Sequence, residues 1–213
     1  MPTPFPYKDG DGIEMRLTPD TPVYRPQFGL HIARVASYWS DVELYWAIAY
    51  TYLLANTDKD AFATYYSLRD WRRRKSEFFK AADAHRLPGP LKSEAHDLYA
   101  EFDARARDRN RIVHGTWAWS PQYDDSIFLA QPRQLGSQLN RVFTALINIG
   151  QRPEQYPTVA VDLGRGTYER WTHQDFEDSV AEIRAFAARV SDLGNRILSH
   201  SLEVVIRRLR PGT

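Results

Sequence analysis

The stretch Arg105-Ala-Arg-Asp-Arg-Asn-Arg-Ile-Val-His114, followed directly by Gly115, decides how the rest of the chain is interpreted. Upstream of it, apolar residues recur every three or four positions, as on one face of an α-helix. This face comprises Leu91, Ala95, Leu98, Phe102, Ala106 and Val113. The pattern predicts a helix over about residues 91–114. Gly115 is expected to take the left-handed conformation that often follows a helix end.

Polar residues interrupt this pattern near the end of the predicted helix. Arg109 falls on the apolar face, where a leucine would be expected. Asn110 and His114 are four positions apart and are therefore neighbours on the helix surface. On a straight helix, Arg109 and His114 would point about 140° apart, so Arg109 must reach around or the helix must tighten. With either adjustment, a guanidinium, an amide and an imidazole gather beside a core, which predicts a functional site.

The combination of Arg109, Asn110 and His114, with four residues between the arginine and the histidine, resembles the signature of the HEPN superfamily. The resemblance implies a small helical domain that forms a homodimer and builds one site from two helices. Many HEPN domains are metal-independent endoribonucleases, often toxins or phage-defence proteins, whereas others are not catalytic. The resemblance therefore implies RNA as substrate or ligand, no cofactor and no metal ligand. An antitoxin or a nucleotidyltransferase is a candidate partner protein.

The chemistry of RNA cleavage suggests a role for each of these residues. An internal 2′-hydroxyl needs a proton acceptor, the leaving 5′-oxygen needs a proton donor, and an imidazole such as that of His114 can act as either. Arg109 can hold two phosphate oxygens and stabilise the charge of the transition state. Asn110 can donate to the phosphate or fix the imidazole tautomer. Because one helix supplies one histidine, the second proton role falls to a symmetry mate, to the basic helix or to water.

Composition excludes several classes of function. The 213 residues carry a formal net charge of +1, so any attraction for nucleic acid must be local. The absence of cysteine excludes disulfides, thiolate metal sites and cysteine nucleophiles. The six histidines show no metal-ligand spacing. The first residues do not resemble a secretion signal, and the apolar run over 42–55 is too short for a bilayer. We therefore expect a cytoplasmic protein without a membrane segment.

The fold class predicted from these patterns is mainly α, an antiparallel helical bundle with a small β-hairpin appendage. Helices are expected over about 27–55, 59–85, 91–114 and from Thr172 to about residue 203, with Asp175 completing a capping box with Thr172. The expected domains are an irregular N-terminal arm (1–28), one helical domain (29–203) and a basic C-terminal tail (204–213). A β insertion around 116–171 would hold a hairpin over 116–130, a helix over 134–150 and a second hairpin over 158–171.

Charged side chains elsewhere are candidate supporting residues. Glu43 lies within the apolar stripe of the first long helix, where a carboxylate needs a partner. We expect Glu43 to pair with Arg109, either to position it for a phosphate or as a purely structural ion pair. The densest basic cluster follows in the next helix and is either a phosphate-binding surface or a solvated helix face. It comprises Arg72, Arg73, Arg74 and Lys75.

Three functional hypotheses remain open from the sequence. The first is a metal-independent endoribonuclease that uses Arg109, Asn110 and His114. The second is a non-catalytic module of the same kind that binds a nucleotide or RNA. The third is a protein-interaction or regulatory protein in which the same residues form a buried polar network that fixes helix packing. The exposure and relative placement of Arg109 and His114 discriminate among them.

Overall fold

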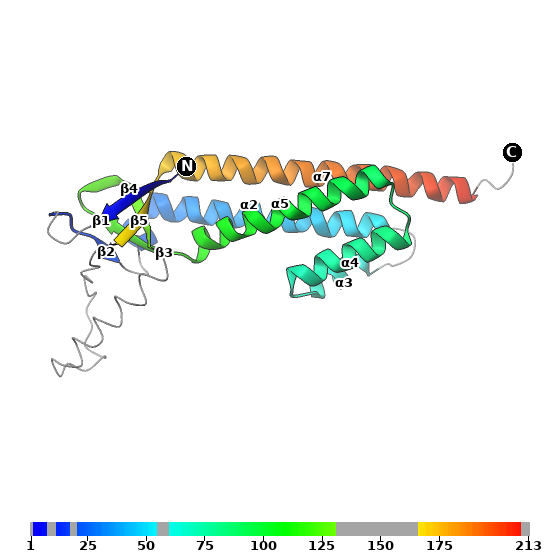
Figure 1. Cartoon of the computed structure of the whole chain (residues 1–213), viewed down its shortest axis with the longest axis horizontal. Helices are drawn as coiled ribbons and strands as arrows, with labels where there is room; N and C mark the ends of the chain where they lie inside the picture. Colours follow the sequence, from blue (N-terminus) through cyan, green and yellow to red (C-terminus); the bar gives the residue numbers. More distant parts are fainter. Residues whose placement is uncertain (1, 8–11, 18–20, 55–59, 131–165, 210–213) are drawn as a thin grey trace, which may run out of the picture. The chain divides into compact units, whose positions relative to one another are not determined.

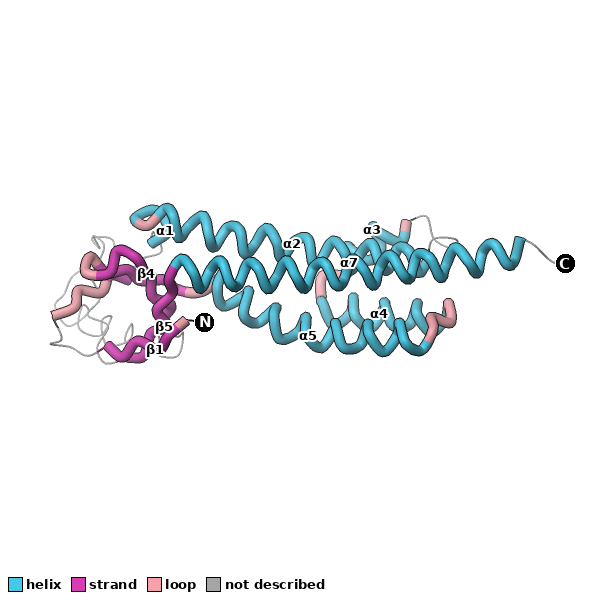
Figure 2. Tube along the Cα trace, turned by 90° about the horizontal axis from the view of Figure 1, so that it is seen from above, coloured by secondary structure: helices cyan, strands magenta, loops and turns pink. Residues whose placement is uncertain are grey.

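The computed structural model describes residues 2–7, 12–17, 21–54, 60–130 and 166–209, and these residues form a mainly helical fold with one antiparallel sheet (Figures 1 and 2). The elements in chain order are β1 (Thr3–Tyr7), β2 (Arg16–Leu17), α1 (Thr21–Tyr24), α2 (Pro26–Leu54), α3 (Ala61–Ser67), α4 (Trp71–Ala84), α5 (Gly89–His114), β3 (Thr116–Ser120), β4 (Tyr123–Ala130), β5 (Gly166–Thr172) and α7 (His173–Leu209). The predicted mixture of helices with a small β part is confirmed at this level.

The chain divides into two compact units, and each takes part of α2, α5 and α7. The sheet unit comprises Met1–Ala36 and Arg109–Val180. The bundle unit comprises Ser37–Asp108 and Ala181–Thr213. The candidate site residues Arg109, Asn110 and His114 therefore belong to the sheet unit. The helix expected over 134–150 and the strand expected over 158–163 lie outside the described residues.

The sheet has the strand order β1-β5-β4-β3-β2 and is antiparallel throughout. Its hairpin of β3 and β4 was predicted, and Thr116 pairs with Ala130 in its register. The prediction of an irregular arm over 1–28 is wrong, because this segment supplies two strands, α1 and the start of α2. The edge strand β1, in which Phe5 pairs with Tyr168, contains two prolines, which an edge strand tolerates.

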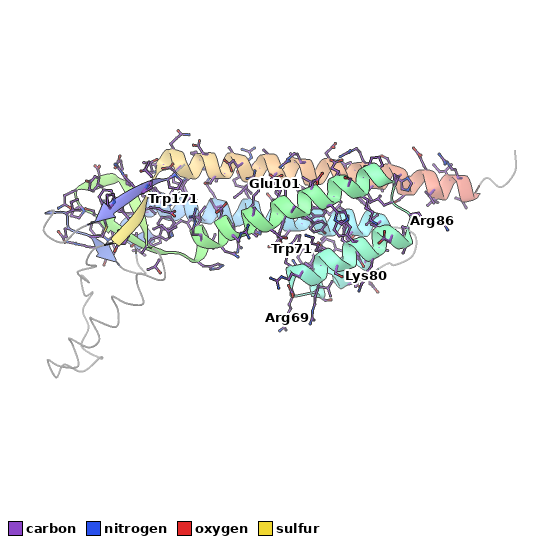
Figure 3. The ribbon with its side chains drawn as sticks, in the orientation of Figure 1. Arg69, Trp71, Lys80, Arg86, Glu101 and Trp171 are labelled. Atoms are coloured by element: carbon purple, nitrogen blue, oxygen red, sulfur yellow. The ribbon has the colours of Figure 1, made fainter. Side chains whose placement is uncertain are left out.

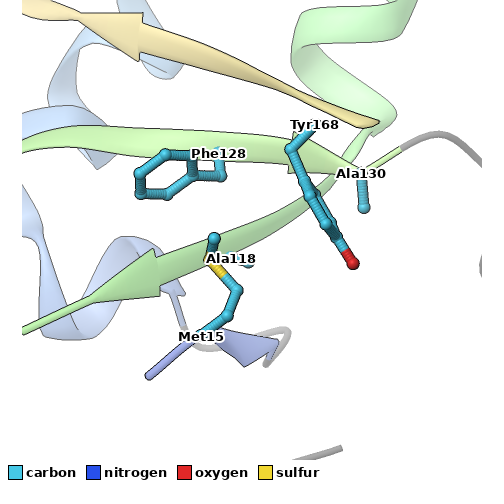
Figure 4. Packing of buried hydrophobic residues seen from close by; sticks show 5 residues of the cluster. All are labelled: Met15, Ala118, Phe128, Ala130 and Tyr168. Carbon is cyan, nitrogen blue, oxygen red and sulfur yellow. The ribbon is translucent and has the colours of Figure 1, made fainter. Parts of the chain in front are cut away.

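Alternating side chains of the sheet bury both of its faces. One face carries a cluster of Met15, Ala118, Phe128, Ala130 and Tyr168, shown in Figure 4. The other face carries Trp117 and Trp171, whose ring centroids are 5.8 Å apart. Phe176 from α7 packs 5.0 Å from Trp171 and 6.0 Å from Phe28 of α2. The first turns of α2 and α7 are thereby fixed against the sheet.

Aromatic side chains form the core of the bundle unit. Trp46 of α2 stacks on Tyr99 of α5 at 3.7 Å, and Trp39 lies 4.6 Å from Phe102. Increasing positions on α2 thus meet decreasing positions on α5, so these two helices run antiparallel. Phe78 of α4 adds an edge contact of 5.3 Å to Trp46. These aromatic side chains therefore form a packed core.

Ion pairs show that α7 also runs antiparallel to α5 within the bundle unit. Arg196 pairs with Glu94, Arg189 with Glu101, and Arg105 with Glu182. Close to these pairs, a Cβ on Gly194 would lie 3.5 Å from the Cβ of Ala49 on α2, so α7 and α2 approach closely. An antiparallel bundle arrangement is therefore present in this unit.

Two further boundaries differ from the sequence prediction. The helix expected over 59–85 is broken into α3 and α4, because Leu68 is extended and Asp70 accepts a hydrogen bond from the Arg72 amide at 2.9 Å. An aspartate in this position caps a new helix instead of continuing the previous one. At the other end of the chain, α7 continues to Leu209, so most of the expected tail over 204–213 is helical.

Candidate functional site

Arg109, Asn110 and His114 converge at the end of α5. The Arg109 Nη1 donates to the Asn110 Oδ1 at 2.8 Å and lies 3.5 Å from the His114 Nε2. Asn110 and His114 are exposed, whereas Arg109 is half-buried. The long arginine side chain therefore spans the angular separation that a straight helix imposes on positions 109 and 114. The three polar groups meet at the surface and not inside a sealed core.

The contacts of Arg109 leave its positive charge without a carboxylate partner among the described residues. The neighbouring Arg111 does have one, because its Nη1 lies 2.7 Å from the Glu169 Oε1. Glu169 also accepts a hydrogen bond from the Trp171 indole at 3.3 Å. The Arg109 Nε is buried and has no hydrogen-bond partner in the described part of the chain. A guanidinium in such partly desolvated surroundings interacts more strongly with an anion than one in bulk water.

The 3.5 Å contact between Arg109 and His114 constrains the imidazole chemistry. A guanidinium nitrogen can only donate a hydrogen bond, so it can bond only a His114 Nε2 that bears a lone pair. For this hydrogen bond to form, a neutral imidazole must carry its proton on Nδ1. A general base requires such a lone pair on Nε2. The same guanidinium nitrogen, Arg109 Nη1, donates to the Asn110 Oδ1. Asn110 contacts Arg109 and has no described contact with the imidazole.

The junction between α5 and β3 fixes the position of His114. Gly115 does not have the expected left-handed conformation, since its φ is not positive. A Cβ at Gly115 would instead lie 2.3 Å from both the Arg111 carbonyl oxygen and the Leu129 Cδ1. The strand begins one residue later, and the Trp117 indole donates to the Ile112 carbonyl at 3.0 Å. Glycine is thus required by close packing, because Gly115 is the single residue between the helix and the strand.

The buried residue in the last turn of α5 lies one position before the residue that the predicted apolar face included. Ile112 is 2% exposed, whereas Val113, which was expected on the apolar face, is only half-buried. The Ile112 carbonyl accepts the hydrogen bond from the buried Trp117 indole of β3, a contact that the periodicity of the helix alone does not include.

Glu43 has partners in the bundle unit in place of the expected Arg109. Its Oε1 accepts from the Trp39 indole at 2.9 Å, and its Oε2 lies 3.6 Å from Arg74. Arg74 in turn donates to the Leu68 carbonyl at 2.7 Å. These contacts hold the start of α4 and correct the expectation that Glu43 positions Arg109. The physical reason is the break between α3 and α4, which turns the Arg74 side chain back toward α2.

The basic cluster of α4 divides into two pairs of residues with different surroundings. Arg72 and Arg73 are exposed, and neither has an ion pair among the described residues. Arg74 is paired as described above, and Lys75 lies 3.4 Å from the Asp103 carboxylate of α5. Arg72 and Arg73 are therefore the members of the predicted basic cluster that are exposed and have no ion pair among the described residues.

A histidine pair in the sheet unit was not foreseen from the sequence. The His31 Nε2 and the His173 Nδ1 are 2.9 Å apart, and Glu177 lies 3.5 Å from the His31 Nδ1 and pairs with Arg34. Burial lowers the pKa of His31; Glu177 opposes this shift, while His173 and Arg34 add to it. The two histidines are 142 positions apart, so no local pattern could have linked them.

The comparisons add no family assignment. No family model, no curated protein and no solved structure matches this chain. Within the described ranges, no group of three or more histidine or acidic side chains is placed to hold a metal ion. None of the helices in those ranges has the length and apolarity needed to cross a membrane.

Proposed function

We propose that Arg109, Asn110 and His114 bind a phosphodiester of RNA and cleave it by attack of the neighbouring 2′-hydroxyl. The observation that supports this function is the convergence of the Arg109 Nη1 and the His114 Nε2 to 3.5 Å on an exposed part of α5. A guanidinium and an imidazole at this separation can contact the same phosphate group. The resemblance of these residues to the HEPN signature is the second support.

In the proposed reaction, the 2′-oxygen forms a bond to phosphorus while the bond from phosphorus to the 5′-oxygen breaks. The His114 Nε2 accepts the proton of the 2′-hydroxyl, and a second donor protonates the leaving 5′-oxygen. The products are a 2′,3′-cyclic phosphate and a 5′-hydroxyl. No metal ion is needed for this chemistry, because proton transfer and a fixed cation supply the stabilisation.

Arg109 has two roles in this proposal. At rest it donates to Asn110 and faces His114. When its donors turn to two phosphate oxygens, it neutralises the developing negative charge and frees the lone pair of His114. Asn110 keeps one guanidinium nitrogen oriented during this exchange. The donor for the 5′-oxygen is the His114 of a second copy, so the functional form is a homodimer.

The test is cleavage of a uridine-containing RNA oligonucleotide in EDTA by the full chain and by matched variants. We expect His114→Ala to lower the cleavage rate by about 10²–10⁴-fold, the usual contribution of a general acid or base. Arg109→Ala is expected to lower it by about 10²–10³-fold through loss of charge stabilisation. A cyclic phosphate end on the product identifies the internal attack.

Controls on the same helix separate a catalytic from a general effect. His96→Ala removes another exposed histidine of α5, and Arg107→Ala removes another exposed arginine. Both variants should cleave at the wild-type rate. RNA that stays intact with the wild-type chain, or a His114→Ala variant as active as His96→Ala, would refute the cleavage. Salt-sensitive binding that needs Arg109, but without cleavage, would instead identify a non-catalytic RNA-binding module.

A further inference from the structure

Two aromatic rings are exposed side by side on α3. Phe62 is 41% exposed and Tyr66 is 39% exposed. They are one helical turn apart, their ring centroids are 4.9 Å apart, and their planes differ by 35°. Adjacent exposed rings mark a surface that another molecule can cover.

Three exposed arginines follow this aromatic pair directly in the chain. Arg69 lies in the link between α3 and α4, and Arg72 and Arg73 lie in the first turn of α4. None of the three has an ion pair within the described ranges. In Figure 3, Arg69 projects at the N-terminal end of α4, opposite the end at which Arg86 lies.

The contacts of Arg74 hold the aromatic pair and the arginines together. The Arg74 Cζ lies 5.4 Å from the Tyr66 ring, and its Nη2 donates to the Tyr66 carbonyl at 3.4 Å. Arg74 is itself neutralised by Glu43 at 3.6 Å, and the Asp70 carboxylate is engaged as the cap of α4. The surface thus combines two exposed rings on α3 with the exposed charges of Arg69, Arg72 and Arg73 in the link and in the first turn of α4.

We propose that Phe62, Tyr66, Arg69, Arg72 and Arg73 form a docking surface for single-stranded nucleic acid. Unpaired bases expose ring faces that can stack on Phe62 and Tyr66, while the arginines contact the phosphates between them. In a duplex the base faces are already stacked, so the aromatic pair selects a single strand. This surface lies in the bundle unit and does not depend on the cleavage proposed for Arg109 and His114.

The experiment measures the fluorescence anisotropy of a labelled oligothymidylate of about 15 nucleotides, a length suited to such surfaces, with the full chain. This DNA has no 2′-hydroxyl and cannot undergo the proposed cleavage, so binding and cleavage are assayed separately. The double variant Phe62→Leu/Tyr66→Leu keeps the apolar bulk and removes the aromatic faces. We expect it to weaken binding by about tenfold or more, with an unchanged salt dependence.

The triple variant Arg69→Gln/Arg72→Gln/Arg73→Gln tests the charges. Between about 50 and 200 mM salt, it should reduce the slope of log affinity against log salt by about 2, because each phosphate contact on a single strand contributes roughly 0.7. Arg86→Gln removes an exposed arginine at the opposite end of α4 and should bind within about twofold of wild type.

Three results would overturn the proposal. The first is that neither oligothymidylate nor oligouridylate binds at low salt. The oligouridylate measurement uses the His114→Ala variant, so that the RNA is not cleaved. The second is a Phe62→Leu/Tyr66→Leu variant that binds like wild type. The third is concentration-dependent self-association that this variant abolishes, which would identify the aromatic pair as a protein interface.

Discussion

Replacing Gly115 by alanine should destabilise the junction between α5 and β3. The added Cβ would stand 2.3 Å from the Arg111 carbonyl oxygen and from the Leu129 Cδ1, far inside van der Waals contact. Leu129 can change rotamer, but the Arg111 carbonyl is part of the helix backbone and cannot move alone. Overpacking of this kind costs about 1–3 kcal/mol. For a chain of this size, the Tm should fall by about 2–12 °C.

Gly89→Ala is the matched control at the other end of the same helix. No atom lies within 4 Å of a Cβ built on Gly89, and its φ is not positive. The substitution restricts the unfolded chain and should stabilise the protein by about 0.4–1 kcal/mol. Thermal unfolding followed by circular dichroism at neutral pH should therefore give Tm shifts of opposite sign for the two alanine variants.

The same substitution bears on the site, because His114 immediately precedes Gly115. A displacement of about 1 Å in a reacting group can cost about 10²-fold in rate. Gly115→Ala should therefore also lower RNA cleavage at a temperature where the variant is folded. A Gly115→Ala variant with the Tm of the wild type would refute the close approach inferred between the helix end and β4.

Two further predictions concern buried polar groups. Burial lowers the pKa of His31 in the folded chain below its ordinary value of 6.5. Just below pH 6.5 the unfolded chain therefore binds more protons than the folded chain. The stability that is present above about pH 6.5 is lost as the pH falls toward the folded pKa. His31→Gln should flatten the dependence of Tm on pH across this window, and an unchanged profile would contradict the assignment. Tyr65→Phe should cost about 1–3 kcal/mol, because the buried Tyr99 hydroxyl loses its partner at 3.4 Å. Urea unfolding of Tyr65→Phe, Tyr99→Phe and the double variant should show that their losses of unfolding free energy are not additive. Strictly additive losses would count against the hydrogen bond between the two hydroxyls.

The sequence identified the helices that have a long periodic apolar face. The predicted ranges 27–55 and 91–114 agree within two residues with α2 and α5. The start of α7 was also readable, since the Thr172 amide donates to the Asp175 Oδ2 at 2.9 Å, as the capping pattern predicted. These features depend on residues within one or two turns of each other.

The strands of the N-terminal segment could not be read in the same way. β1 is short and contains two prolines, and it is ordered by pairing with β5, where Phe5 meets Tyr168. The break between α3 and α4 was missed for a related reason. The apolar pattern continues through Leu68, and the Asp70 cap decides the boundary.

At the site, the sequence determined which chemical groups lie at the end of α5, because the order Arg109, Asn110 and His114 follows from the chain itself. Only the structure showed that Arg109 reaches His114 within α5, and only the tertiary structure decided that Glu43 of α2 pairs with Arg74 of α4. Helical periodicity fixes the direction of a Cβ, but the rotamer of a long side chain is selected by distant elements that pack around it. Partner choice and exposure therefore come from the fold as a whole.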